Sequence, residues 1–450
     1  MSEVIKIKKG LNIKLKGEAD KIRVQAPRSA TYAVKPVDFQ SLTPKIDARP
    51  CDEVKVGTTL FHDKYRPEIR YSSPVSGKVL SILRGERRRI ISVVVEDDGK
   101  DTMETFLKGD PNDLTREQII KNLLDSGMWP MIRQRPFNIV ANPQDVPKSI
   151  FISGFDTAPL APDYDYIMKD QLEDFQWGID ALRKLTSGKI HLNQSANYPV
   201  VNTFRNIRNV QINSFSGPHP AGNAGIQIHH IDPINKNERV WIVQPQEVSA
   251  IGRLFRSGNY DPKMIVALTG SEVKKPLYYR VIRGAEVSTI LQDNVGEGDV
   301  RYISGNVLSG RQVPADGHLG YYAYQLTVIP EGKHHEMFGW IKPGLSKFSA
   351  SRTFLSWMTP NRKYRLDTNM HGGERAFVMT GEYNKVLPMN ILPVQLLKSI
   401  LVEDIDRMEQ LGIYEVCEED LALCEFVCTS KTPVTAILRK GLDTIRKEME

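Results

Sequence analysis

The chain has 450 residues, of which 40% are hydrophobic and 25% charged, and its formal net charge is +6. This composition is typical of a globular protein of two to four domains and excludes a disordered chain. No apolar run reaches the ~18–20 residues that a membrane helix needs, and the N-terminus lacks the apolar core of a secretory signal. We therefore expect a soluble protein that is not exported and that reaches a membrane through a partner or at the lipid surface.

The positive charge is spread along the chain and mixed with acidic residues, and no DNA- or RNA-recognition motif is present, so no nucleic-acid partner is expected. One dense basic run, Arg84-Gly-Glu-Arg-Arg-Arg89, lies between two strand-like segments. Its position predicts a hairpin tip in solvent, with contact to anionic lipid or to an acidic partner as the alternative.

Residues 1–105 have the pattern of an all-β domain. Val54-Lys-Val-Gly57 and Ser73-Pro-Val-Ser-Gly-Lys-Val79 together resemble the barrel-sandwich hybrid of biotinyl and lipoyl domains. Lys64 stands where a lipoyl carrier has its modified lysine. The connection that follows it is longer than a lipoyl hairpin, so an unmodified lysine is expected and a lipoyl-type carrier remains an alternative.

Residues 106–260 predict an entry helix followed by a Rossmann-like α/β domain. Thr115-Arg-Glu-Gln118 is a capping box that opens the entry helix, and Gly127 ends it. Beyond it the pattern predicts strands at 149–153, 210–215, 226–231 and 240–244, and helices at 164–187 and 247–256.

The remaining third of the chain divides in two. Residues 261–330 predict a small β-grasp-like module of the SLBB type, with strands at 264–269, 277–282, 302–305 and 323–328 and a short helix at 285–291. Residues 331–450 form a C-terminal segment that turns helical from about residue 385. The fold class is therefore multi-domain α/β, and α+β overall.

The motifs that could carry redox chemistry are weak. Pro218-His-Pro-Ala-Gly-Asn-Ala-Gly225 is rich in glycine but is not G-x-G-x-x-G, and a strand is expected after it, so nucleotide or flavin binding lacks a helix N-terminus. His229-His230 on a strand would point to opposite faces, and no third metal ligand accompanies them or His334-His335.

The C-terminal cysteines give an equally weak signal for a metal site. They are Cys417, Cys424 and Cys428, with the spacing C-x6-C-x3-C. An iron–sulfur cluster usually needs four cysteines in closer runs, so buried and unreactive thiols are expected. No catalytic residue and no metal ligand is assigned.

Taken together, these motifs resemble those of one family, the A subunits of the sodium-pumping NADH:quinone oxidoreductases of bacteria. The resemblance covers nearly the whole chain. It includes the segments Ile5–Leu11, Ser73–Val79, Arg84–Glu86, Arg133–Phe137, Phe155–Ala161, Gly222–Gly225, His229–Ile234, His371–Arg375 and Glu419–Cys428.

The resemblance implies a six-subunit inner-membrane complex that couples NADH oxidation and quinone reduction to sodium export. It implies that FAD, FMN, riboflavin, iron centres and quinone are used in other subunits, and that this chain has no cofactor and is inactive alone. It further implies a peripheral protein on the cytoplasmic side, assembled with the other subunits and docked chiefly on the membrane-embedded B subunit. The family is also distantly similar to the NADH-binding flavoprotein of complex I and to the C subunit of Rnf complexes.

Quinone access is a further role that the resemblance implies. A quinone head group needs an apolar slot with a few polar donors. The candidate contacts are Phe155, Asp156, Asn223, His229 and His230. Two alternatives stay open beside the family function, namely an autonomous flavin- or NADH-binding oxidoreductase and a lipoyl-type carrier. An Rnf-type C subunit would need ferredoxin cysteines that the sequence lacks.

Overall fold

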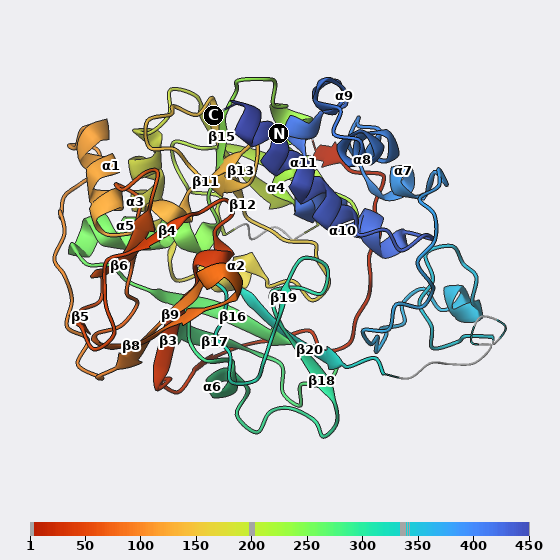
Figure 1. Cartoon of the computed structure of the whole chain (residues 1–450), viewed down its shortest axis with the longest axis horizontal. Coiled ribbons are helices and arrows are strands. Elements are labelled where there is room, and N and C mark those ends of the chain that lie inside the picture. The colour runs from red at the N-terminus through yellow and green to blue at the C-terminus, as the bar shows by residue number, and fades with distance from the viewer. Residues whose placement is uncertain (1–3, 198–202, 334–338, 340, 342, 450) are drawn as a thin grey trace.

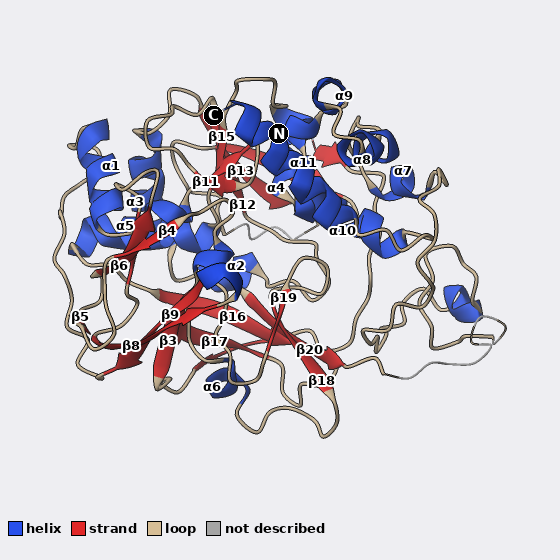
Figure 2. Ribbon diagram, viewed as in Figure 1, coloured by secondary structure: helices blue, strands red, loops and turns tan. Residues whose placement is uncertain are grey.

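A computed structural model describes residues 4–197, 203–333, 339, 341 and 343–449 of the chain. Four sheets and a group of C-terminal helices make up the molecule (Figure 1). Figure 2 shows most of the helices in the upper part of the same view, around one of the sheets, and further sheets in the lower part. The pair His334-His335 lies outside the described residues.

The N-terminal barrel-sandwich hybrid is confirmed as two small facing sheets. Gly77 begins one of its strands with φ +147°, and a Cβ there would lie 1.9 Å from Glu96 O, so the position requires glycine. The strands are β3 (Thr31–Val34), β9 (Ile90–Asp97), β8 (Gly77–Arg84) and β5 (Glu53–Val54) in one sheet, and β4 (Pro44–Ile46), β6 (Thr59–Asp63) and β7 (Arg70–Ser72) in the other.

The entry helix is confirmed as α1 (Arg116–Asp125). The Thr115 hydroxyl accepts a hydrogen bond from Gln118 N, and the Gln118 side chain accepts one from Thr115 N. These bonds satisfy two of the amide groups that a helix start leaves without partners.

The second domain is built on a seven-stranded sheet whose central strands are parallel. Their order places β12 beside β15, although two strands separate them in the chain. The strands, in sheet order, are β1 (Val4–Lys6), β14 (Gln211–Ser216), β13 (Lys189–Ser195), β12 (Ser149–Ser153), β15 (Val240–Ile242), β10 (Arg133–Arg135) and β11 (Ile139–Val140).

Two expectations for this domain were wrong. The helix expected at 164–187 is two helices, α2 (Tyr164–Met168) and α3 (Leu172–Arg183). The strand expected at 226–231 is helix α4 (Ala224–Ile231). The first five residues of α4 are all buried. A helix that is buried on all sides shows no apolar stripe. The alternation of Ile226 and Ile228 with other residues then has the period-2 pattern expected of a strand.

Helix α5 (Pro245–Ser257) packs on α3 and ends at Gly258, which has the left-handed φ of +77°.

The third domain is confirmed as a sheet with one short helix, α6 (Val287–Leu291). Its strands, in sheet order, are β19 (Arg311–Val313), β18 (Val300–Ser304), β20 (Gln325–Pro330), β16 (Lys263–Thr269), β17 (Leu277–Ile282) and β2 (Asp20–Gln25).

The first residues of the chain tie the domains together. Strand β1 pairs with β14 of the second domain, and β2 pairs with β17 of the third. One continuous hydrophobic core accordingly includes residues from the first three domains.

The C-terminal helices build a second core against loops of the α/β domain. Figure 1 shows them together at the upper right. None of the helices in the described ranges combines the length and apolar character needed to cross a membrane. The helices are α7 (Glu382–Val386), α8 (Pro393–Leu401), α9 (Ile405–Gln410), α10 (Glu418–Val427) and α11 (Val434–Met449), and short 3-10 turns occur at Pro36–Asp38, Glu86–Arg88, Trp129–Met131, Leu355–Met358 and Ile413–Glu415.

Candidate functional site

The strand order of the α/β domain indicates where this fold can bind a ligand. The chain runs outward from β12 to β13 and β14 and then returns to the other side of β12 as β15. In open α/β sheets, ligands bind beyond the carboxyl ends of the strands where the order reverses. We call this place the switch-point region. It lies between the loop that follows β12 and the first turn of α5.

Two carboxyl groups lie in the switch-point region. Asp156 lies in the loop after β12 and accepts a hydrogen bond from Ala158 N at 2.8 Å. Glu247 lies in the first turn of α5, fully buried, and accepts a bond from Gln244 N at 3.2 Å. Burial raises the pKa of both groups, although Arg283 and Arg133 oppose the shift at Glu247. Both are suited to hold a proton where ordinary carboxyl groups have lost it.

Arginines and tyrosines surround Glu247 in the switch-point region. Arg283 Nη1 lies 4.0 Å from Glu247 Oε1, and its guanidinium stacks 4.2 Å from the centre of the Tyr321 ring. Arg133 stacks on Tyr322 at 5.0 Å. We did not predict these residues from the sequence. Identifying the switch point from the strand–helix order is the one signal that could have singled out Glu247.

The structure divides the five candidate quinone contacts into two groups. Phe155, Asp156 and Asn223 lie close together, because a Cβ on Gly222 would be 2.9 Å from the Cα of Asp156. The two histidines lie toward the other end of α4, about 9 Å along the helix at 1.5 Å per residue.

Both histidines face the C-terminal segment. His229 Nδ1 is 2.6 Å from Glu415 Oε2, and its Nε2 accepts a hydrogen bond from Asn390 N at 3.1 Å. His230 Nε2 lies 3.0 Å from Pro388 O. These partners explain the histidines as contacts between the α/β domain and the C-terminal helices.

Other residues of the chain pack closely against the glycine-rich loop that precedes α4. A helix does follow it, contrary to expectation, and Asn223 is the residue at which α4 begins. A Cβ on Gly225 would lie 2.2 Å from Asp420 Oδ2, so a carboxylate of the C-terminal segment occupies the first turn of α4. The Asn223 amide also donates to Glu419 O at 2.9 Å. An acidic side chain therefore stands where a phosphate could otherwise approach the helix.

Cys417, Glu419 and Asp420 have potential metal-ligating atoms within 4.8 Å of one another. Arg135, with 1% of its side chain exposed, lies among them. Its Nη2 is 2.7 Å from Glu419 Oε1 and its Nη1 is 3.8 Å from Asp420 Oδ2. Burial raises the pKa of Asp420 to about 6, and Arg135 opposes that shift. The positive charge that this acidic group attracts is thus supplied by an arginine.

The three C-terminal cysteines are all buried, and their burial is as predicted. Burial raises the pKa of Cys424 to about 12. Burial also acts to raise the pKa of Cys428, but a hydrogen bond from the Tyr383 hydroxyl at 3.0 Å and one from Thr432 N at 3.2 Å outweigh it and lower that pKa. Cys424 is therefore a thiol at neutral pH.

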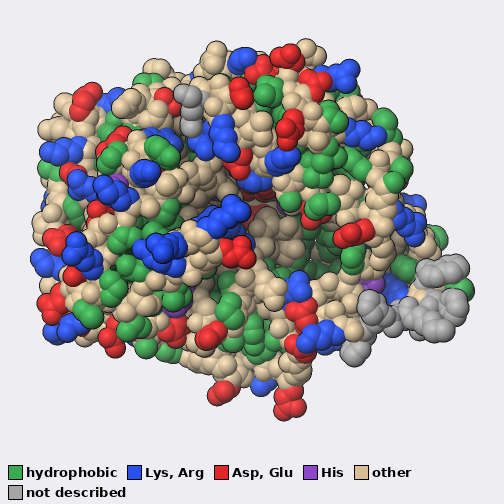
Figure 3. Space-filling view, viewed as in Figure 1, with side chains coloured by type: hydrophobic (Ala, Val, Ile, Leu, Met, Phe, Trp, Pro, Cys, Tyr) green, Lys and Arg blue, Asp and Glu red, His purple; other side chains and the backbone are tan. Residues whose placement is uncertain are grey.

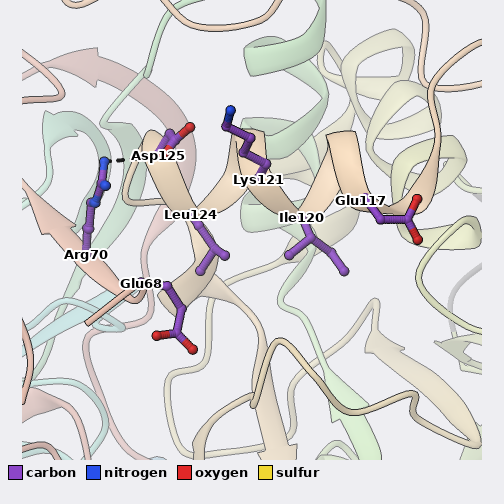
Figure 4. Close-up of a pocket in the computed structure, with 7 residues that line it drawn as sticks. All are labelled: Glu68, Arg70, Glu117, Ile120, Lys121, Leu124 and Asp125. Carbon is purple, nitrogen blue, oxygen red and sulfur yellow. Dashed lines mark ion pairs between the residues drawn. The ribbon is translucent and has the colours of Figure 1, made fainter. Parts of the chain in front are cut away.

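A separate surface pocket lies beside α1 and has a volume of about 310 Å³. Figure 4 shows Ile120 and Leu124 pointing from α1 toward it, with charged side chains around them and an ion pair between Arg70 and Asp125 at 3.2 Å. Its wide opening and charged rim make it a poor place to enclose an apolar ring. Figure 3 shows a further hollow near the centre of the viewed face, between the C-terminal helices and the six-stranded sheet.

Family models match three parts of the chain. They are described as the NqrA N-terminal barrel-sandwich hybrid domain (residues 5–98), the NqrA second alpha/beta domain (114–260) and the NqrA C-terminal, SLBB-type domain (265–315). A chain of the NAD+-reducing NiFe hydrogenase is a distant structural neighbour, with a TM-score of 0.41 and 10% identity over 76% of this chain and 62% of that chain.

Relatives are similar over their whole length. The chain is 40% identical over 449 residues to the A subunit of the Na+-translocating NADH-quinone reductase of Neisseria meningitidis serogroup A, covering 99% of this chain and 100% of that protein. The corresponding protein of Yersinia pestis bv. Antiqua is 40% identical over 448 residues with the same coverage. The chain therefore belongs to the NqrA family, the A subunits of the Na+-translocating NADH-quinone reductases, which are oxidoreductase complexes.

Proposed function

We propose that this chain is the peripheral NqrA component of a sodium-pumping NADH:quinone reductase, that it docks on the membrane-embedded B subunit at the cytoplasmic side of the bacterial inner membrane, and that it carries no redox cofactor of its own. The observation that carries the proposal is full-length similarity to the NqrA proteins of two different bacteria. Family membership implies further subunits as partners. The function that we propose for this chain is to assemble the complex and to give quinone access to it.

Three features of the residues support a chain without a cofactor. The loop after β12 reads Ser153-Gly-Phe-Asp-Thr-Ala-Pro159 and has one glycine in place of the G-x-G-x-x-G pattern that lets a backbone approach a pyrophosphate. The glycine-rich loop before α4 is packed against Asp156 and Asp420. Cys417 lies beside the carboxyl groups of Glu419 and Asp420, and the Arg135 cation already pairs with Asp420 there.

The proposal is tested with membranes from a strain whose gene for this chain is deleted. We expect NADH-driven quinone reduction and sodium uptake to be absent there and to return when the full chain is added back. The chain purified alone should be colourless and have the encoded mass. A flavin or iron–sulfur absorption band, or extra mass on the peptide that contains Lys64, would contradict the cofactor-free role.

We propose that quinone reaches the complex at the switch-point region, beside the loop that follows β12. Phe155 supplies an apolar ring beside Asp156. Burial raises the pKa of Asp156, and its carboxyl group, when protonated, is the donor that we propose for a quinone oxygen. His229 and His230 are excluded from this set, because their ring nitrogens meet the C-terminal segment.

Replacing Asp156 by alanine in the assembled complex should raise the KM for quinone about tenfold, since one buried hydrogen bond contributes about 0.5–1.5 kcal/mol. The KM for NADH should not change. The matched control is His229→Ala, for which we expect an unchanged quinone KM. A quinone KM that responds to His229→Ala and not to Asp156→Ala would contradict this location.

A further inference from the structure

A surface loop between the third domain and the C-terminal helices exposes several large apolar side chains. It comprises residues 343–362, and we call it the 343–362 loop. Leu345 is 56% exposed, Leu355 46%, Trp357 52% and Met358 64%. In Figure 1 its short 3-10 turn is the light-blue helix at the right edge, away from the sheets. Exposed apolar side chains gathered in one segment mark an interaction surface.

Hydrogen bonds give the 343–362 loop a fixed shape. Leu355 N donates to Pro343 O at 3.0 Å, which closes the loop, and the Ser356 hydroxyl donates to Lys347 O at 2.5 Å. Gly344 has φ +61° and packs so closely against Phe354 that a Cβ would lie 2.3 Å from that ring. The apolar side chains are therefore presented by a rigid turn.

The body of the protein holds the loop from its C-terminal end. Tyr364, which is buried, donates its N–H to Lys14 O at 2.7 Å, and Lys14 Nζ donates to Pro360 O at 3.0 Å. The ring of Phe348 packs edge-on against Tyr364 at 5.5 Å. Trp357 and Met358 stay 52% and 64% exposed despite this anchoring.

All charged side chains in and just after the 343–362 loop are basic. Residues 343–366 contain five basic residues and no aspartate or glutamate. Lys363 and Arg365 pair with Glu18 and Glu272 of the protein body. Arg352 and Arg362 are exposed and have no carboxylate partner within the described ranges. The surface is thus complementary to one that is acidic as well as apolar.

We propose that the 343–362 loop is a docking surface for another protein of the complex, which receives Trp357 and Met358 in an apolar depression rimmed by aspartate or glutamate. This proposal rests on the proposed function and adds to it the surface by which the chain docks. Tryptophan and arginine dominate the energetics of protein interfaces, and a rigid turn suits a partner of matching shape. A fluid bilayer would not require the fixed geometry of this loop.

The test uses the membrane complex prepared without this chain, to which the purified full-length chain is titrated. We expect Trp357→Ser with Met358→Ser to weaken binding at least about tenfold, because two central apolar anchors are lost. Arg352→Gln with Arg362→Gln should lower the affinity at low salt and flatten its salt dependence. The matched control is Leu401→Ser with Val402→Ser, a pair on another surface with 51% and 72% exposure, which should bind as the wild type does.

Each other result contradicts the proposal. Wild-type affinity of the Trp357 and Met358 variant, with a circular dichroism spectrum like that of the wild type, would remove the loop from the interface. Binding of the wild-type chain to vesicles of anionic phospholipid that this variant loses would assign the loop to the bilayer. Failure of the wild-type chain itself to bind and to restore quinone reduction would instead refute the proposed function.

Discussion

Replacing Arg135 by methionine should lower the free energy of unfolding by about 3–5 kcal/mol, the cost of leaving a buried charge without its partner. Arg135 is 1% exposed, and the carboxylates of Glu419 and Asp420 lie 2.7 and 3.8 Å from its nitrogens. Methionine fills a similar volume, so the loss reports on charge more than on packing. Urea unfolding at pH 7, followed by circular dichroism, measures the difference.

Two further variants separate charge from packing at this position. Adding Asp420→Asn to Arg135→Met should recover part of the lost stability, because the second change removes a charge that the first leaves uncompensated. Arg256→Met, which breaks an ion pair at a 36% exposed side chain, should cost no more than about 1 kcal/mol. Equal effects of Arg135→Met and Arg256→Met would show that the buried cluster does not bind the C-terminal segment to the α/β domain.

Replacing Gly252 by alanine should destabilise the protein by about 3 kcal/mol, at the upper end of the usual cost of overpacking. A Cβ at Gly252 of α5 would lie 1.8 Å from Asp174 O, and one at Gly178 of α3 would lie 2.0 Å from Val248 O. The atoms that obstruct both positions are backbone carbonyls in helices, which cannot turn aside. The two helices must therefore move apart, and Glu247 in the first turn of α5 moves with them.

The measurement is the midpoint of thermal unfolding, together with the quinone KM of the complex. Gly373→Ala is the control, because nothing lies within 4 Å of the Cβ that it adds and its φ is not in the left-handed range. We expect no change in that variant. A Gly252→Ala protein as stable as the control would mean that the contact between α3 and α5 adjusts without cost.

Much of the local structure could be predicted from the sequence where one local force decides it. The capping box at Thr115, the hairpin tip at Arg84–Arg89 and the end of α5 at Gly258 follow from hydrogen-bonding and backbone preferences of a few neighbouring residues. The prediction failed at α4, where burial on every side removes the periodic pattern that identifies a helix.

The candidate site depended less on local pattern. The loop at Phe155 and Asp156 was singled out from the sequence, and it does lie at the switch point. His229 and His230 were predicted as contacts of the same quinone slot. Both histidines lie near the far end of helix α4, so they are distant from Asp156 and contact the C-terminal segment.

The sequence by itself determined the family, the order of domains and the types of most elements, because forty per cent identity over the whole chain and local propensities need no coordinates. Only the tertiary structure decided that β1 and β2 leave the first domain to join two other sheets, and that Arg135 meets Glu419 and Asp420 across 284 residues or more of chain. It also decided that Arg283 from the third domain lies beside Glu247 of the α/β domain. Contacts of this kind arise from long-range packing and buried charge pairing, which neighbouring residues in a sequence do not specify.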